Sequence, residues 1–111
     1  MLTIEKLKEY GADVDSGLAR CMGMQDFYLR LVNMELDDKN FQALKEAMEK
    51  RDAKAAFEAL HALKGAVGNL SLTPLFAPIN EMTELLRKRT DTDYSALLHE
   101  AQMQFEKLCS L

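Results

Sequence analysis

The stretch LHALKGAVGNL, residues 60–70, belongs to a longer apolar pattern that indicates the fold. From residue 53 onward, apolar side chains recur every three or four positions, the spacing that places them on one face of an α-helix. This face consists of Ala53, Ala56, Phe57, Leu60, Leu63, Val67 and Leu70. Asp52 stands just before the pattern, where an N-cap side chain would accept a hydrogen bond from the first turn. We therefore expect a helix from Asp52 to about Asn69 that buries this face in a helical core.

A second set of residues lies on another side of the same predicted helix. His61, Lys64, Gly65 and Gly68 follow one another so that they share one flank, which we call the His61 face. At about 100° per residue, His61 and Gly68 fall roughly 110–130° from the centre of the apolar face, which predicts an exposed imidazole. Each glycine costs a helix interior roughly 0.5–1 kcal/mol relative to alanine. Two glycines beside one histidine therefore indicate that a large group approaches the imidazole closely.

Two short helices are predicted near the N-terminus. The first covers residues 3–10 and ends at Gly11, a residue suited to a left-handed C-cap. Asp15 would cap the second, which covers residues 15–22 and stops at Gly23.

A longer helix is predicted over residues 25–50. An apolar seven-residue repeat keeps its phase across the polar segment of residues 37–40, which favours one long bent helix over two separate ones. The repeat consists of Phe27, Leu31, Met34, Phe41, Leu44 and Met48.

Two more helices follow residue 70. Thr73 and Pro74 have the form of an N-cap followed by proline at the first helical position. Pro78 would remove a backbone hydrogen bond, so this helix is expected to start late or to bend there before it ends in the cations of residues 87–89. After a polar turn, a last helix begins near Tyr94. Four substantial helices with short connections predict an all-α fold, an antiparallel up-down-up-down four-helix bundle with short N-terminal helices.

Composition and charge support one helical domain over residues 1–111. Glycine and proline are scarce (5 and 2 residues), and helix-forming residues dominate. A net charge of -4 argues against a nucleic-acid partner, because binding to a duplex needs a basic face. Cys21 and Cys109 form no metal-binding or disulfide pattern, so we expect two buried thiols in a reducing cytosol. Charged residues near the N-terminus and the lack of an apolar span predict a cytoplasmic protein without membrane attachment.

The His61 face has the chemistry of a group carrier. A lone histidine most often has a structural or solvated role, which is how we interpret His99, since no second histidine lies at a ligand spacing from it. An exposed imidazole is largely neutral at cytoplasmic pH, so one ring nitrogen of His61 keeps a lone pair and can act as a nucleophile. Lys64, one turn away, would stabilise a phosphoryl group. Gly65 and Gly68 would leave space for a docking protein, and Gly68→Gln is therefore expected to fold and to block transfer.

These residues resemble the signature of the histidine-containing phosphotransfer (HPt) domain, approximately His-x-Leu-Lys-Gly followed by a small residue. His61 falls on the phospho-accepting histidine, and Lys64 with Gly65 falls on the Lys-Gly pair. Residues 68–70 match the small-x-apolar segment that follows.

The resemblance extends toward the N-terminus. Residues 13–20 are similar to the family's lead-in segment, and residues 26–28 to the start of its long helix. Asp52 lies where the family often has Gly-Asp. Ser71 departs from the pattern, since many members carry glycine just after the histidine helix, so a slightly different helix end is expected.

The resemblance implies a phosphorelay role in a two-component pathway. A phosphoryl group would move reversibly between His61 and an aspartate of a response-regulator receiver domain. The implied partners are receiver domains and a hybrid histidine kinase, with magnesium held by the receiver and no cofactor on this chain. The chain would be a monomeric phosphocarrier without kinase or phosphatase activity.

The alternative is a helical adaptor that binds a receiver domain or another signalling protein without carrying phosphate. The His61 face favours the carrier, because an adaptor needs no nucleophile beside two glycines. A metal- or cofactor-binding bundle is disfavoured, because inward-facing Glu-x-x-His pairs are missing.

Overall fold

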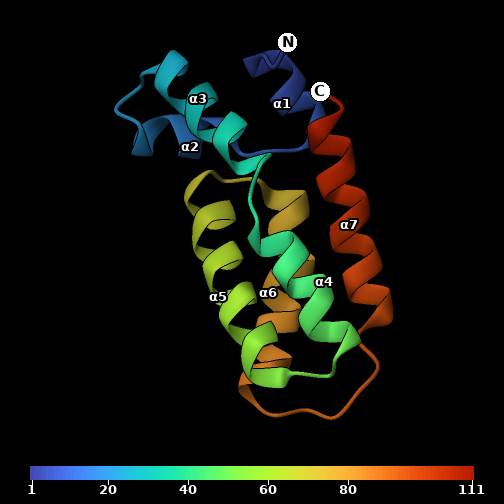
Figure 1. Cartoon of the computed structure of the whole chain (residues 1–111). Helices are drawn as coiled ribbons and strands as arrows, with labels where there is room; N and C mark the ends of the chain where they lie inside the picture. The colour runs from blue at the N-terminus through green and yellow to red at the C-terminus, as the bar shows by residue number, and fades with distance from the viewer.

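The computed structural model describes residues 1–111 as seven α-helices without any strand (Figure 1). The prediction of an all-α fold is therefore confirmed. The helices are α1 (Ile4–Tyr10), α2 (Val14–Arg20), α3 (Gln25–Glu35), α4 (Asn40–Glu49), α5 (Ala53–Asn69), α6 (Thr73–Arg87) and α7 (Ser95–Cys109). None of them combines the length and the apolar character that a membrane crossing requires.

Helices α4 to α7 form an antiparallel up-down-up-down bundle, as predicted (Figure 1). The rings of Phe41 on α4 and Phe105 on α7 stack with their centroids 4.1 Å apart, which joins the first helix of the bundle to the last. Helices α1, α2 and α3 lie at the end of the bundle where α5 ends and α6 begins (Figure 1). The bundle thus carries three short N-terminal helices, one more than expected.

The additional helix arises because the predicted long helix over residues 25–50 is wrong. Residues 36–39 separate α3 from α4. The Asp38 carboxylate accepts a hydrogen bond from the backbone N–H of Asn40 at 2.8 Å. Such a local side-chain contact competes with helix continuation, so a new helix begins at Asn40.

The seven-residue repeat does not describe the buried face of α3. That face consists of Tyr28, Val32 and Glu35, and the side chains of Phe27 and Met34 are 41% and 65% exposed. Once α3 and α4 are separate helices, they need not share one apolar phase, and the repeat holds only in α4.

The core contains twenty buried hydrophobic residues, and the predicted face of α5 supplies many of them. Leu60, Leu63 and Val67 are fully buried, whereas Ala53 is exposed because it lies in the first turn of α5.

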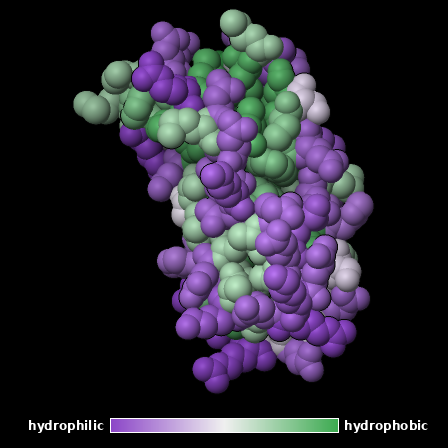
Figure 2. All heavy atoms as spheres, in the orientation of Figure 1, coloured by the Kyte–Doolittle hydropathy of each residue, from purple (hydrophilic) through white to green (hydrophobic).

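Hydrophilic side chains cover most of the bundle in Figure 2, and hydrophobic side chains reach the surface mainly at the upper end, over α1 to α3. Cys21 is buried as predicted, but Cys109 is exposed, because the buried face of α7 ends at Leu108.

The predicted helix ends are correct to within a few residues. Thr3 caps α1, and Gly11 ends it with a φ of 108°. The N-cap of α2 is Asp13 and not Asp15, because the Asp13 carboxylate accepts a hydrogen bond from the backbone N–H of Ser16.

Helix α6 does not start late; it begins at Thr73, one residue before Pro74, the predicted first helical position. Leu72 is its N-cap, and the Thr73 hydroxyl donates to the Ser71 carbonyl at 3.4 Å instead of capping the helix. The helix continues through Pro78, which is buried. It therefore tolerates the one missing backbone hydrogen bond at that position.

Candidate functional site

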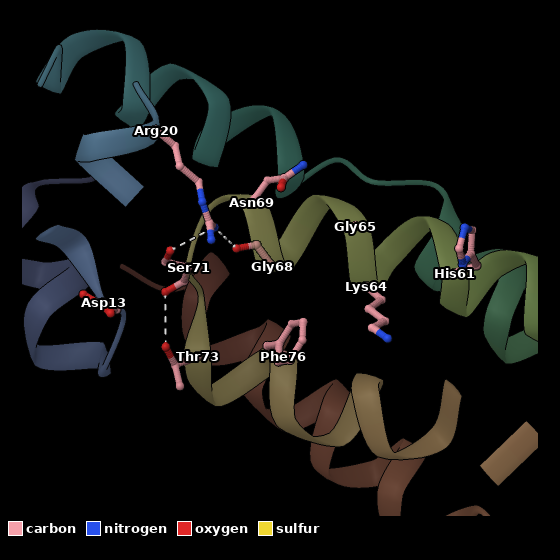
Figure 3. Close-up of a pocket in the computed structure, with 10 residues that line it drawn as sticks. All are labelled: Asp13, Arg20, His61, Lys64, Gly65, Gly68, Asn69, Ser71, Thr73 and Phe76. Carbon is pink, nitrogen blue, oxygen red and sulfur yellow. Dashed lines mark hydrogen bonds between the residues drawn. The ribbon is translucent and has the colours of Figure 1, made fainter. Parts of the chain in front are cut away.

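The four residues of the His61 face lie together in one pocket of about 470 Å³. The pocket is open to solvent, and Phe76 is its one large apolar side chain (Figure 3). Its lining consists of Asp13, Arg20, His61, Lys64, Gly65, Gly68, Asn69, Ser71, Thr73 and Phe76. These residues come from α2, α5, α6 and the turns beside them, so the site forms where the N-terminal helices meet the bundle.

His61 lies exposed on the side of α5. The Phe57 ring, one turn earlier, is roughly parallel to the imidazole, with the ring centroids 6.1 Å apart and the planes at 23°. The Arg87 guanidinium from α6 lies over the same Phe57 ring, with its Cζ 5.5 Å from the centroid. No hydrogen bond joins His61 to the other pocket residues, so the imidazole is open to an incoming group (Figure 3).

Lys64 forms an ion pair that the sequence did not indicate. Its Nζ lies 3.3 Å from Oε1 of Glu84 on α6, and Nε of Arg87 lies 3.5 Å from the same oxygen. The hydrogen bond from Lys64, with the nearby Arg87 charge, lowers the pKa of the Glu84 carboxyl below its usual range. Glu84 is therefore ionised at neutral pH and shared by two cations.

The two glycines of the His61 face have different surroundings. A Cβ added at Gly65 would meet no atom within 4 Å, so this position is open to solvent. A Cβ added at Gly68 would lie 3.0 Å from Cε1 of Phe76 on α6. The lack of a side chain at Gly68 therefore serves the packing of α5 against α6, whereas at Gly65 it leaves free surface.

Ser71 keeps the helix end in the left-handed conformation that glycine usually provides. Its φ is 56°. The Ser71 N–H donates to the Gly68 carbonyl, and the Leu72 N–H donates to the Val67 carbonyl, both at 3.1 Å. These two bonds form a Schellman motif, so the expected difference in the helix end is not found.

Arg20 on α2 fastens this helix end to the N-terminal helices. Its Nη1 donates to the Gly68 carbonyl and, at 3.4 Å, to the Ser71 hydroxyl (Figure 3). The backbone N–H of Asp13 donates to the Ser71 carbonyl at 2.9 Å. The contact between Arg20 and Gly68 spans 48 positions, which explains why sequence spacing gave no sign of it.

Sequence analysis thus found four of the five pocket residues on α5, all except Asn69. It also missed Arg20, Phe76 and the partner of Lys64, Glu84. Helical periodicity predicts neighbours on one helix, but it does not indicate which residues another helix brings to them. Residues 13–20 had been recognised as similar to a lead-in segment, yet nothing in that stretch assigned Arg20 to the pocket.

Comparison with known families matches this chain to one family model, described as Hpt domain, over residues 34–110. Comparisons with curated proteins and with solved structures gave no match. The matched range is more than half of the chain and includes α4 to α7 with the His61 face, whereas the similarity noted for residues 13–20 and 26–28 lies outside it. The chain therefore belongs to the Hpt domain family.

Proposed function

We propose that His61 carries a phosphoryl group between aspartates of receiver domains in a two-component phosphorelay. The observation that carries the proposal is the open imidazole of His61 on α5, within the range that the Hpt family model matches. Next to it, the open surface at Gly65 gives a partner protein access to the ring.

The transfer needs only a nucleophile from this chain. A lone pair on one imidazole nitrogen of His61 forms an N–P bond while the acyl O–P bond of a phosphoaspartate breaks. The aspartate leaves as a carboxylate with the bonding electrons, and the proton on the other ring nitrogen stays, so the ring gains one positive charge. The reverse step returns the phosphoryl group to an aspartate.

The charges near His61 suit this role. Lys64 places an ammonium one turn away, and Arg20, which forms no ion pair, adds a second cation at the other end of the pocket, beside Gly68. Magnesium on the receiver domain would supply the further positive charge that transfer to and from aspartate uses. We propose that the chain acts in the cytoplasm as a monomeric carrier, with receiver domains and a hybrid histidine kinase as partners and without kinase or phosphatase activity of its own.

The test is phosphotransfer from a receiver domain labelled with radioactive phosphate. The wild type should take up a label that is stable in alkali and labile in acid. His61→Gln should abolish this label, while the matched control His99→Gln, which changes the other exposed histidine, should keep it. Labelling that persists in His61→Gln, or is lost in His99→Gln, would contradict the proposal.

Exposed apolar side chains on and before α3 favour the adaptor as a second candidate. Met22, Met24, Phe27 and Met34 are all exposed. An adaptor would bind a receiver domain with equal affinity in the wild type and in His61→Gln and would take no label from it. Binding by titration calorimetry, measured beside the labelling experiment, distinguishes the two functions.

A further inference from the structure

The ammonium nearest along the helix to His61 already has a partner in the unphosphorylated protein. Lys64 Nζ donates a hydrogen bond to Glu84 Oε1 at 3.3 Å, and the side chain extends from α5 toward α6 (Figure 3). The side chains of Lys64 and Glu84 are 30% and 41% exposed, so the pair lies at the surface, where ion pairs are weak and exchange readily.

A phosphoryl group on His61 would be a second anionic acceptor for the Lys64 ammonium. Residues three positions apart on a helix are neighbours, so Lys64 can reach a group attached to His61. A phosphoryl group carries more negative charge than a carboxylate and offers three acceptor oxygens. Lys64 must then either leave Glu84 or divide its hydrogen bonds between the two anions.

Arg87 keeps Glu84 paired with a cation when Lys64 moves to the phosphoryl group. Its Nε lies 3.5 Å from the same Oε1 that Lys64 contacts. When Lys64 turns to the phosphoryl group, Arg87 remains beside the carboxylate, and Glu84 is not left without a counter-charge. With two cations beside one carboxylate, the Lys64 ammonium can move to a phosphoryl group on His61 while Arg87 stays with Glu84.

We infer that Glu84 is a positioning residue that competes with the phosphoryl group on His61 for the Lys64 ammonium. The inference rests on the proposed function of His61. Because the Lys64–Glu84 pair stabilises the free form and is weakened in the phosphorylated form, Glu84 shifts the equilibrium toward return of the phosphoryl group to aspartate.

The test measures the ratio of labelled His61 to labelled receiver after phosphoryl exchange has reached equilibrium at low protein concentration. Glu84→Gln should raise this ratio about two- to fivefold, the range expected for removal of one exposed ion-pair partner. Glu81→Gln is the matched control, since Glu81 is exposed on the same helix, carries the same charge and forms no ion pair. A change confined to docking would alter how fast equilibrium is reached and not the final ratio.

The inference also requires that the effect pass through Lys64. In the Lys64→Ala background, Glu84→Gln should leave the ratio unchanged. An equal rise in that background, or no rise in Glu84→Gln alone, would overturn the inference while the label on His61 still supports the proposed function. Absence of any label on His61 would overturn both, so the two failures are distinguishable.

Discussion

At the scale of single residues, the contacts of Lys64 predict separate effects on phosphoryl transfer and on stability. Lys64→Ala should slow transfer to His61 through loss of about 1–3 kcal/mol of stabilisation, the range for a hydrogen bond to a charged group. The free energy of unfolding should fall by less than about 1 kcal/mol, because the pair with Glu84 is exposed. Rapid-quench labelling and urea unfolding measure the two quantities, and unchanged transfer rates would make Lys64 only a surface charge.

The two glycines of the His61 face allow a matched comparison. Gly65→Gln should fold with equal or higher stability, because glutamine favours helix by roughly 0.5–1 kcal/mol over glycine and the position is open. It should block transfer from a receiver domain while any labelling by phosphoramidate, a small donor, persists.

Gly68→Gln was expected from the sequence to fold without cost, but the structure predicts otherwise. The new Cβ would lie 3.0 Å from the Phe76 ring, so the ring must move and the urea midpoint should fall below that of Gly65→Gln. Equal midpoints for the two variants would contradict this account and support a purely docking role for Gly68. Periodicity placed both glycines on one flank, but only tertiary contacts separate their roles.

At the scale of elements, α3 ends at a buried carboxyl group, directly before the break that separates it from α4. Glu35 is buried at the end of α3, and its Oε1 has no hydrogen-bond partner. Burial, with the nearby Asp38 carboxylate adding to it, raises the pKa of the Glu35 carboxyl to about 9. Glu35 is therefore neutral in the folded chain at pH 7.

This pKa predicts how stability depends on pH. The ordinary value of 4.5 applies to the unfolded chain, so between pH 4.5 and about 9 the folded chain binds the additional proton. The contribution of Glu35 to stability is complete below pH 4.5 and is lost as the pH rises toward 9. Glutamine has nearly the same shape as a protonated glutamate but does not titrate, so Glu35→Gln should flatten the decline in urea midpoint between pH 5 and pH 9. A variant that declines as steeply as the wild type would assign the pH dependence to other groups.

The elements themselves were predictable where local chemistry decides them. Gly11 and Asp52 define helix ends through contacts within a few residues, and sequence analysis named both as caps. It placed Thr3 at the start of the first helix, where the structure has it as the N-cap. The break at Asp38 was missed because a regular apolar repeat outweighed one local cap. The exposed positions of Phe27 and Met34 show that the repeat alone does not establish burial.

At the scale of the whole molecule, Tyr28 joins the N-terminal helices to the bundle. Its buried hydroxyl donates to the Leu70 carbonyl at 2.7 Å, and burial raises the pKa of Tyr28 to about 12. The ring also lies against Gly17, where an added Cβ would be 2.5 Å from it. The hydrogen bond from Tyr28 to the Leu70 carbonyl spans 42 positions, so sequence alone gave no means to predict it.

Tyr28→Phe should reduce the free energy of unfolding by about 1–2 kcal/mol, because it removes a buried hydrogen bond and leaves the carbonyl unpaired. Urea unfolding measures the loss. Labelling of His61 by phosphoramidate should not change, since the hydroxyl lies outside the pocket. A variant as stable as the wild type would show that water satisfies the carbonyl equally well.

The open position of His61 determines how long a phosphoryl group would remain on the molecule. The imidazole is exposed on one face of a helix, and the pocket beside it is open, so water reaches the ring. The fold would then not shield the P–N bond from hydrolysis. An unshielded phosphoryl group would suit a carrier that passes it on quickly better than one that holds it for long.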